Sequence, residues 1–359
     1  MSAFVSFRPL KALARFRLRW GRRIGQTAMA TTSSVTCDEA ARPPVPAAVA
    51  PSFSHLKRPD FFIVGAPKCG TTAMAQYLSS HPDVFMPVVK EMHQFGSDLQ
   101  FSGAFFRRRR DAYLAEYEHR SSERRAGEAS VWYLYSQKAA QEIKDFCPEA
   151  GIIIMLRDPV ESIYSQYYQF LYDGNEHLQS FEEALEAEDD RRANRRITRH
   201  THFVQGLLYT ETVRYTDQVR RYFKTFGRDR VHVIVYDDLA ADPAGTYRET
   251  LAFLGVDPNL GEARFRVVNP TKYSKFPLLK NILNNRTLRM TAHGICGRLP
   301  RKVFTTLRRY EGKIWRANTR FGERPPMSPS TRKRLKRLFA PEVARLGRLL
   351  DRDLSHWSK

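Results

Sequence analysis

The sequence has few cysteines and no long apolar run. Its four cysteines, Cys37, Cys69, Cys147 and Cys296, are scattered along the chain, without the spacing of a disulfide framework or a zinc site. We interpret them as reduced thiols, which favours a cytoplasmic location. No apolar stretch reaches the roughly 18 to 20 residues that span a bilayer as a helix. We therefore expect no membrane-spanning helix.

Acidic residues are also scarce. Asp and Glu together number 38, against 59 Lys and Arg, so the 359-residue chain has a formal net charge of +21. Such a charge favours anionic partners, namely a nucleotide, an acidic polymer, nucleic acid or a lipid surface, but it does not choose among them. With 42% hydrophobic residues, the chain can bury a sizeable core, and we expect one large domain with appendages.

The N-terminal stretch is rich in arginine, and the first acid is Asp38. It lacks the continuous apolar segment of a secretory signal, which leaves an organelle-targeting peptide, an interfacial helix or a disordered basic leader. A Pro- and Ala-rich linker follows. We divide the chain into a disordered leader with this linker (1–58), a central domain (59–270) and a basic helical C-terminal extension packed on the domain (271–359).

Short apolar runs alternate with helical periodicity in the central domain. The runs DFFIV (60–64), GIIIML (151–156) and VHVIVY (231–236) are brief and apolar enough to be strands covered on both faces. Between and after them, apolar residues recur at helical spacing, as they do again over 335–350. The alternation predicts an α/β fold, with a P-loop-like parallel sheet flanked by helices.

The first apolar run ends in GAPKCGTT, residues 65–72, a small-residue turn before a helix. Backbone N–H groups and the helix dipole meet at such a turn and favour an oxyanion. Lys68 would add positive charge, and Thr71 and Thr72 would add hydroxyl donors. Because Lys68 precedes Gly70, the pattern differs from the NTPase loop G-x-x-x-x-G-K-[ST]. The alternative is a glycine turn with an exposed lysine.

A second strand-to-helix junction carries RDPVESIYS, residues 157–165. Arg157 leaves the strand, where a guanidinium can bind a second phosphate, and the hydroxyl of Ser165 on the adjoining helix can complete that site. The alternatives are a structural ion pair between Arg157 and Asp158, and an exposed helical serine. Two anion sites on one parallel sheet indicate a ligand with two phosphate-bearing ends.

Taken together, these motifs resemble the sulfotransferases that use 3′-phosphoadenosine 5′-phosphosulfate, and are most similar to the branch of heparan sulfate and bacterial carbohydrate sulfotransferases. The resemblance covers roughly residues 60–255. APKCGTTAM resembles the 5′-phosphosulfate loop, and LRDPVESIYSQYYQF resembles the 3′-phosphate motif. The donor-binding residues that the resemblance implies are Lys68, Cys69, Gly70, Thr71, Thr72, Arg157 and Ser165.

The resemblance also implies the chemistry. A sulfuryl group would pass in line to an acceptor hydroxyl, with a base to take the hydroxyl proton and no metal in the scheme. KEMHQF places Glu91 at the position of the catalytic base and His93 at that of a nearby histidine. Lys68 would stabilise charge on the bridging oxygen. Without the resemblance, Glu91 would more often be a surface carboxylate paired with Lys90, and His93 an ordinary histidine.

The chain departs from the heparan-type pattern near the expected acceptor. Ala129 and Val131 stand where many such members have a lysine and a proline, and Met92 stands where proline is common. The missing positive charge favours a neutral hydroxyl, on a carbohydrate or a lipid-linked sugar, over an acidic polymer. Trp132 and Tyr133 would offer this acceptor an aromatic surface, unless they pack in the core.

Two other classes of function stay open. One is a P-loop kinase or NTPase, because VHVIVYDDL resembles a strand that ends in a magnesium-binding acid. The other is a non-catalytic binder of nucleic acid or anionic membrane, which the basic ends of the chain favour. No RNA-binding motif accompanies the charge, so we expect no specific nucleic-acid partner. Peripheral contact with an anionic membrane through the basic termini stays a hypothesis.

Overall fold

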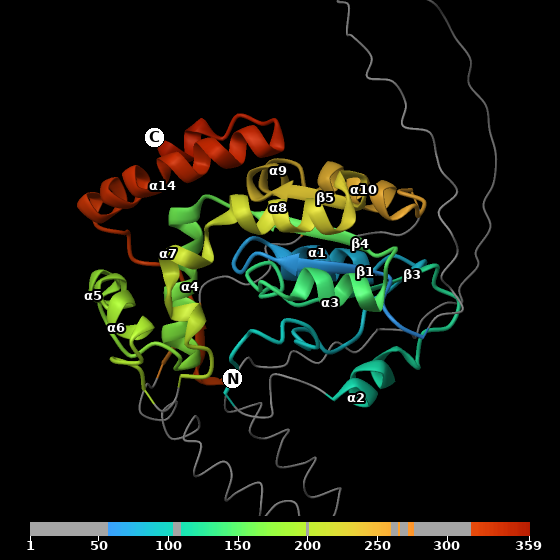
Figure 1. Ribbon diagram of the computed structural model, residues 1–359, viewed down its shortest axis with the longest axis horizontal. Coiled ribbons are helices and arrows are strands. Elements are labelled where there is room, and N and C mark those ends of the chain that lie inside the picture. Colours follow the sequence, from blue (N-terminus) through green and yellow to red (C-terminus); the bar gives the residue numbers. More distant parts are fainter. Residues whose placement is uncertain (1–56, 103–108, 199–200, 260–264, 266–271, 276–316) are drawn as a thin grey trace, which may run out of the picture.

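The computed structural model describes residues 57–102, 109–198, 201–259, 265, 272–275 and 317–359. Its centre is a five-stranded sheet in the order β2-β3-β1-β4-β5, in which all neighbouring strands run parallel. Helices flank this sheet (Figure 1). The strands are β1 (Phe61–Gly65), β2 (Val84–Phe85), β3 (Arg125–Ala129), β4 (Gly151–Leu156) and β5 (Val231–Val235). The predicted α/β fold is confirmed, whereas most of the leader predicted for residues 1–58 lies outside the described residues.

The three apolar runs of the sequence form the middle and one edge of the sheet. Every residue of β1 and β4 is buried, because both are inner strands of a sheet that helices flank (Figure 1). These three strands were predicted. The sequence did not reveal β3, whose five buried residues include the charged Arg125 and Glu128. Arg125 bonds the buried Asp60 (Nε to Oδ1, 2.5 Å), and this pairing lets a charged residue occupy an inner strand.

Helices and short antiparallel strands complete the described part. The α-helices are α1 (Thr71–Ser79), α2 (Arg110–Leu114), α3 (Ala139–Phe146), α4 (Pro159–Asp173), α5 (Phe181–Glu186), α6 (Glu188–Arg192), α7 (Tyr209–Thr212), α8 (Tyr215–Phe226), α9 (Tyr236–Ala241), α10 (Pro243–Leu254) and α14 (Pro329–Leu350). The strands β6 (Lys272–Ser274) and β7 (Thr319–Phe321) pair antiparallel. No helix of the described residues is long and apolar enough to cross a membrane.

Helix α14 lies along one side of the molecule, next to α8 and α4 (Figure 1). Leu335, Phe339 and Leu346 are buried, which confirms a helix with one apolar side. The apolar residues at helical spacing over 335–350 also include Leu338, which we predicted to lie on this same side, but Leu338 is 56% exposed, so that prediction is wrong. The helix thus docks through residues three or four apart. The proposed domain boundary near residue 270 stays a prediction.

Candidate functional site

The turn between β1 and α1 has the left-handed backbone that the glycine pattern requires. Lys68 has a φ of 65° and Gly70 a φ of 89°. The backbone angle of Gly70 favours glycine, and a Cβ added there would also displace the end of the Leu239 side chain, since it would lie 2.9 Å from Leu239 Cδ2. The turn is fixed to the neighbouring strand by a hydrogen bond from Ala66 N to Met155 O (2.7 Å). It thereby presents the N-terminus of α1 at the carboxyl end of β1.

Cys69, one of the implied donor-binding residues, has its side chain in the core. Its Sγ lies 3.8 Å from the hydroxyl oxygen of Tyr215 and 3.9 Å from Ser162 Oγ. Burial raises the pKa of this thiol to about 11. Ser162 Oγ also donates to Pro67 O at 3.0 Å, which fastens α4 to the turn. The thiol therefore packs the turn from behind, and a ligand contact from Cys69 would come from its backbone N–H.

The second motif faces the turn from α4. Lys68 Nζ donates to Gln169 Oε1 at 3.1 Å, and Gln169 lies one helical turn beyond the partly exposed Ser165. At the other end of this row, the guanidinium of Arg157 stands 4.6 Å from the ring centroid of Tyr236, and its Nη2 lies 3.9 Å from Glu161 Oε2. The bond from Lys68 to Gln169 therefore joins the turn to α4, the helix that carries Ser165. The sequence did not point to Gln169.

Lys90 connects the turn to the predicted base. Its Nζ donates to Thr72 Oγ1 at 3.0 Å and lies 3.5 Å from Thr71 Oγ1. The same atom lies 3.0 Å from Glu91 Oε1. From the sequence, Lys90 was expected only as an ion-pair partner of Glu91. The ion pair is present, and it also places Glu91 beside the turn.

The surroundings of Glu91 favour its ionised form. Burial alone would raise the pKa of this carboxyl, but the charge of Lys90 and a hydrogen bond from Val131 N outweigh burial and hold the pKa below its ordinary value. The Val131 N–H donates to Glu91 Oε2 at 3.0 Å. Glu91 is therefore an available proton acceptor at neutral pH.

His93 lies beside the base but differs from it in charge. Its Nε2 is 3.7 Å from Glu91 Oε2, and its ring packs against Phe101 with centroids 4.5 Å apart. Burial lowers the pKa of His93 to about 4. The imidazole is thus neutral at physiological pH, where it can form hydrogen bonds but contributes no positive charge.

The prediction that Trp132 and Tyr133 form an aromatic surface for the acceptor is wrong. Tyr133 is fully buried and Trp132 is 8% exposed. The Trp132 ring packs on Phe203, with centroids 4.6 Å apart, and the Tyr133 hydroxyl donates to Glu128 Oε1 at 2.7 Å. The alternative considered for this pair, core packing, is therefore the correct one. Ala129 contributes its backbone oxygen, which accepts from Glu91 N at 3.0 Å.

The acids that suggested a magnesium site have structural partners at the C-terminus. Asp237 Oδ2 accepts from Trp357 Nε1 at 2.7 Å and lies 2.8 Å from His356 Nε2. Asp238 pairs with Arg352. These acids anchor the segment that follows α14. Within the ranges that the structure describes, no group of three or more His, Cys, Asp or Glu side chains is arranged to hold a metal ion.

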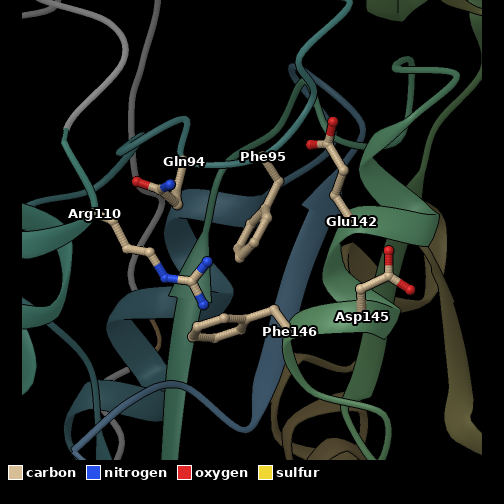
Figure 2. A pocket seen from close by; sticks show the side chains of 6 residues that line it. All are labelled: Gln94, Phe95, Arg110, Glu142, Asp145 and Phe146. Atoms are coloured by element: carbon tan, nitrogen blue, oxygen red, sulfur yellow. The ribbon is translucent and has the colours of Figure 1, made fainter.

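A separate pocket of about 310 Å³ lies beyond the base-bearing segment. Figure 2 shows Arg110 reaching toward Phe146, with Glu142 and Asp145 on the adjoining helix α3. The carboxylate of Glu142 accepts from Gly96 N at 2.6 Å, so one wall of the pocket fixes the end of that segment. None of the predicted site residues lines this pocket, whose lining residues are Gln94, Phe95, Arg110, Glu142, Asp145 and Phe146.

Comparisons with known proteins agree with this geometry. A family model described as the sulfotransferase domain matches residues 58–347. A solved structure of a sulfotransferase from Alicyclobacillus acidocaldarius is 32% identical, covers 84% of this chain and 99% of its own, and superposes with a TM-score of 0.62.

Curated relatives are similar over smaller shares. Carbohydrate sulfotransferase 15 of Mus musculus is 32% identical over an alignment of 152 positions that covers 31% of this chain and 27% of that protein. Bifunctional heparan sulfate N-deacetylase/N-sulfotransferase 1 of Caenorhabditis briggsae is 26% identical over 200 residues, which are 54% of this chain and 22% of that protein. The chain thus spans about a quarter of the length of these curated relatives.

Proposed function

The chain belongs to the sulfotransferase domain family, and from that premise we propose that it transfers a sulfuryl group from 3′-phosphoadenosine 5′-phosphosulfate to an acceptor hydroxyl. The observation that carries the proposal is that the turn between β1 and α1 contacts both α4 and the segment with Glu91. Lys68 reaches α4 through Gln169, and Lys90 joins the turn to Glu91. Donor and base would therefore meet in one place.

The donor would lie between the turn and α4. Its 5′-phosphosulfate would be bound by the N-terminus of α1 and by Lys68, because backbone N–H groups, a helix dipole and an ammonium all favour an anion there. Its 3′-phosphate would be bound by Arg157, which follows β4, and by Ser165 on α4. The hydrogen bond between Lys68 and Gln169 (3.1 Å) supports this arrangement, since it brings the turn against the helix that carries Ser165.

The residues present can carry out the transfer without a metal in the scheme. The acceptor oxygen attacks sulfur, the bond from sulfur to the 5′-phosphate oxygen breaks, and that oxygen keeps the electron pair. Lys68 stabilises the negative charge that grows on the leaving phosphate. Glu91 takes the acceptor's proton, which its lowered pKa permits at neutral pH.

We further propose that the acceptor is a carbohydrate. The names of two relatives, a carbohydrate sulfotransferase and a heparan sulfate N-sulfotransferase, support that class. Ala129 supplies no charge beside Glu91, and this favours a hydroxyl on a neutral sugar over a hydroxyl on an acidic glycan. Trp132 and Tyr133 are buried, so we do not propose that they contact the acceptor.

The proposal is tested by incubating the protein with radiolabelled donor and a panel of acceptors in the presence of EDTA. Chondroitin, heparosan, octyl glucoside and p-nitrophenol represent acidic glycans, a neutral lipid-linked sugar and a phenol. We expect label on a carbohydrate. If the protein instead hydrolysed ATP with magnesium and labelled no acceptor, the kinase or NTPase alternative would replace the proposal.

The role of Arg157 gives a first prediction. Arg157→Ala should remove the preference for 3′,5′-bisphosphoadenosine over 5′-AMP, at a cost of about 2 to 3 kcal/mol for the lost charge-assisted pair. Calorimetry with both nucleotides measures the preference. Arg332→Ala is a suitable control, because Arg332 also pairs with Glu161 (2.7 Å) but lies on α14. An unchanged preference in Arg157→Ala would place the second anion site elsewhere.

Salt dependence gives a second prediction, which concerns the acceptor. The donor is a polyanion, so rising ionic strength should weaken its binding to this basic protein. A neutral sugar acceptor should show a nearly constant KM over the same range. Initial rates at several potassium chloride concentrations measure both constants. If the acceptor KM rose as steeply as the donor KM, the acceptor would itself be polyanionic, as heparan is.

A further inference from the structure

The segment that carries the proposed base has an unusual backbone. Glu91 has a φ of 58° and His93 a φ of 50°, although both have ordinary side chains. Left-handed backbone at such residues is sparsely populated, so two of them so close together persist only where their surroundings hold them. Some neighbouring structure must therefore fix the segment from Glu91 to Phe95.

Residues that end β3 and follow it provide that support. Glu91 N donates to Ala129 O at 3.0 Å. His93 N donates to Ser130 Oγ at 3.2 Å, and Phe95 N donates to the Tyr133 hydroxyl at 3.3 Å. Every second N–H of the segment is therefore hydrogen-bonded to this region, twice through a side-chain hydroxyl.

Both hydroxyls are oriented by one buried carboxylate. Ser130 Oγ and the Tyr133 hydroxyl each donate to Glu128 Oε1 at 2.7 Å, and Glu128 is 1% exposed. A hydroxyl has one proton, so donating it to the carboxylate leaves the oxygen lone pairs available for an incoming N–H. Glu128 thus determines the orientation in which Ser130 and Tyr133 accept the N–H groups of the segment.

We propose that Glu128 is a positioning residue for sulfuryl transfer, and that it acts through Ser130 and Tyr133 to hold the segment Glu91–Phe95 in the conformation that the base requires. This inference rests on the proposed function, in which Glu91 takes the acceptor's proton. The side chain of Glu91 is aligned from the same region, by the N–H of Val131 at 3.0 Å. Backbone and carboxylate of the base therefore both depend on how β3 ends.

Tyr113 on α2 provides a matched control. Its hydroxyl donates to the other oxygen of the same carboxylate, Glu128 Oε2, at 2.6 Å. Ser130 and Tyr133 follow β3 in the sequence, whereas Tyr113 lies on α2, before that strand. If Glu128 only satisfied buried hydroxyls, all three donors would be equivalent. If Glu128 positions the base, Ser130 and Tyr133 matter for turnover and Tyr113 does not.

The test compares Ser130→Ala, Tyr133→Phe and Tyr113→Phe in the full chain. Three properties are measured: hydrolysis of the radiolabelled donor, with water as the acceptor; binding of 3′,5′-bisphosphoadenosine by calorimetry; and Tm. We expect kcat to fall at least about tenfold in Ser130→Ala and Tyr133→Phe, since small misplacements of catalytic groups are costly. Nucleotide affinity should stay within about twofold. The Tm of Tyr113→Phe should fall by an amount similar to that in the other two variants, whereas its kcat should stay within about twofold of the wild-type value.

Hydrogen exchange of the amides from Glu91 to Phe95 adds a readout that needs no acceptor. Exchange should accelerate in Ser130→Ala and Tyr133→Phe and stay unchanged in Tyr113→Phe. Glu128→Gln should combine both defects, because an amide presents an N–H to one of the hydroxyls and disturbs their orientation. If Glu128→Gln fails to fold, the three milder variants still test whether Glu128 positions the base.

The results that would overturn the inference are distinct. Equal losses of kcat in all three milder variants, following Tm, would reduce Glu128 to a core residue. Unchanged kcat in Ser130→Ala and Tyr133→Phe would reject the inference outright. A wild-type protein that neither binds the nucleotide nor hydrolyses the donor would reject the proposed function, and with it a positioning role, whatever the exchange rates show.

Discussion

Replacing Glu91 by glutamine is expected to lower kcat by about 10²- to 10⁴-fold, the usual contribution of a general base. Gln has nearly the same shape, so the bond from Val131 N can persist while the proton acceptor is lost. Binding of 3′,5′-bisphosphoadenosine should stay unchanged, because the proposed nucleotide contacts lie on the turn, at Arg157 and on α4. Transfer kinetics and calorimetry on the same preparation separate the two effects. Undiminished transfer by Glu91→Gln would reject this residue as the base.

The pH profile provides a second view of the same residue. A base is active above its pKa, and the pKa of Glu91 is held below its ordinary value of 4.5. The rate of the wild type should therefore stay level from neutral pH to below about 5 and fall only as the carboxyl becomes protonated. Lys90→Met removes a charge that lowers this pKa, so its acid limb should move to higher pH. An acid limb near neutral pH in the wild type would indicate a different base.

Lys68→Ala is expected to lower kcat by about 10²-fold or more, and to weaken binding of 3′,5′-bisphosphoadenosine by a smaller factor. The reason is that the bridging oxygen carries more negative charge in the transition state than in the ground state, and Lys68 would lie beside it. Steady-state kinetics and calorimetry measure the two losses. Gln169→Ala removes the partner of Lys68 (3.1 Å) but keeps the charge, so it should change kcat by less than about tenfold. Equal losses of kcat and affinity in Lys68→Ala would make Lys68 a binding residue alone.

The sequence predicted the strands whose own residues are mostly apolar. β1 and β4 are buried along their length, and such strands read as continuous hydrophobic runs. β3 was missed because it contains charged residues that are buried through polar contacts. Arg125 bonds Asp60, 65 positions earlier, and Glu128 accepts from three hydroxyls. Hydrophobic periodicity does not reveal such pairings.

The sequence also indicated the turn and the Arg157 motif, because each depends on residue types at short spacing, whereas Glu91 was indicated by the family resemblance alone. The sequence missed Lys90 and Gln169 as parts of the site, since their roles depend on contacts between separate elements. The error at Trp132 and Tyr133 has the same origin. An aromatic pair reads alike whether it faces a ligand or the core, and burial decided for the core.

The most direct test of the account is a crystal structure with 3′,5′-bisphosphoadenosine bound. We expect the 5′-phosphate on the backbone N–H groups of the turn between β1 and α1, with Lys68 beside it, and the 3′-phosphate on Arg157 and Ser165. The carboxylate of Glu91 should then face the 5′-phosphate from the acceptor side, with Lys90 between them. A nucleotide bound elsewhere, or bound with its two phosphates exchanged, would contradict the account.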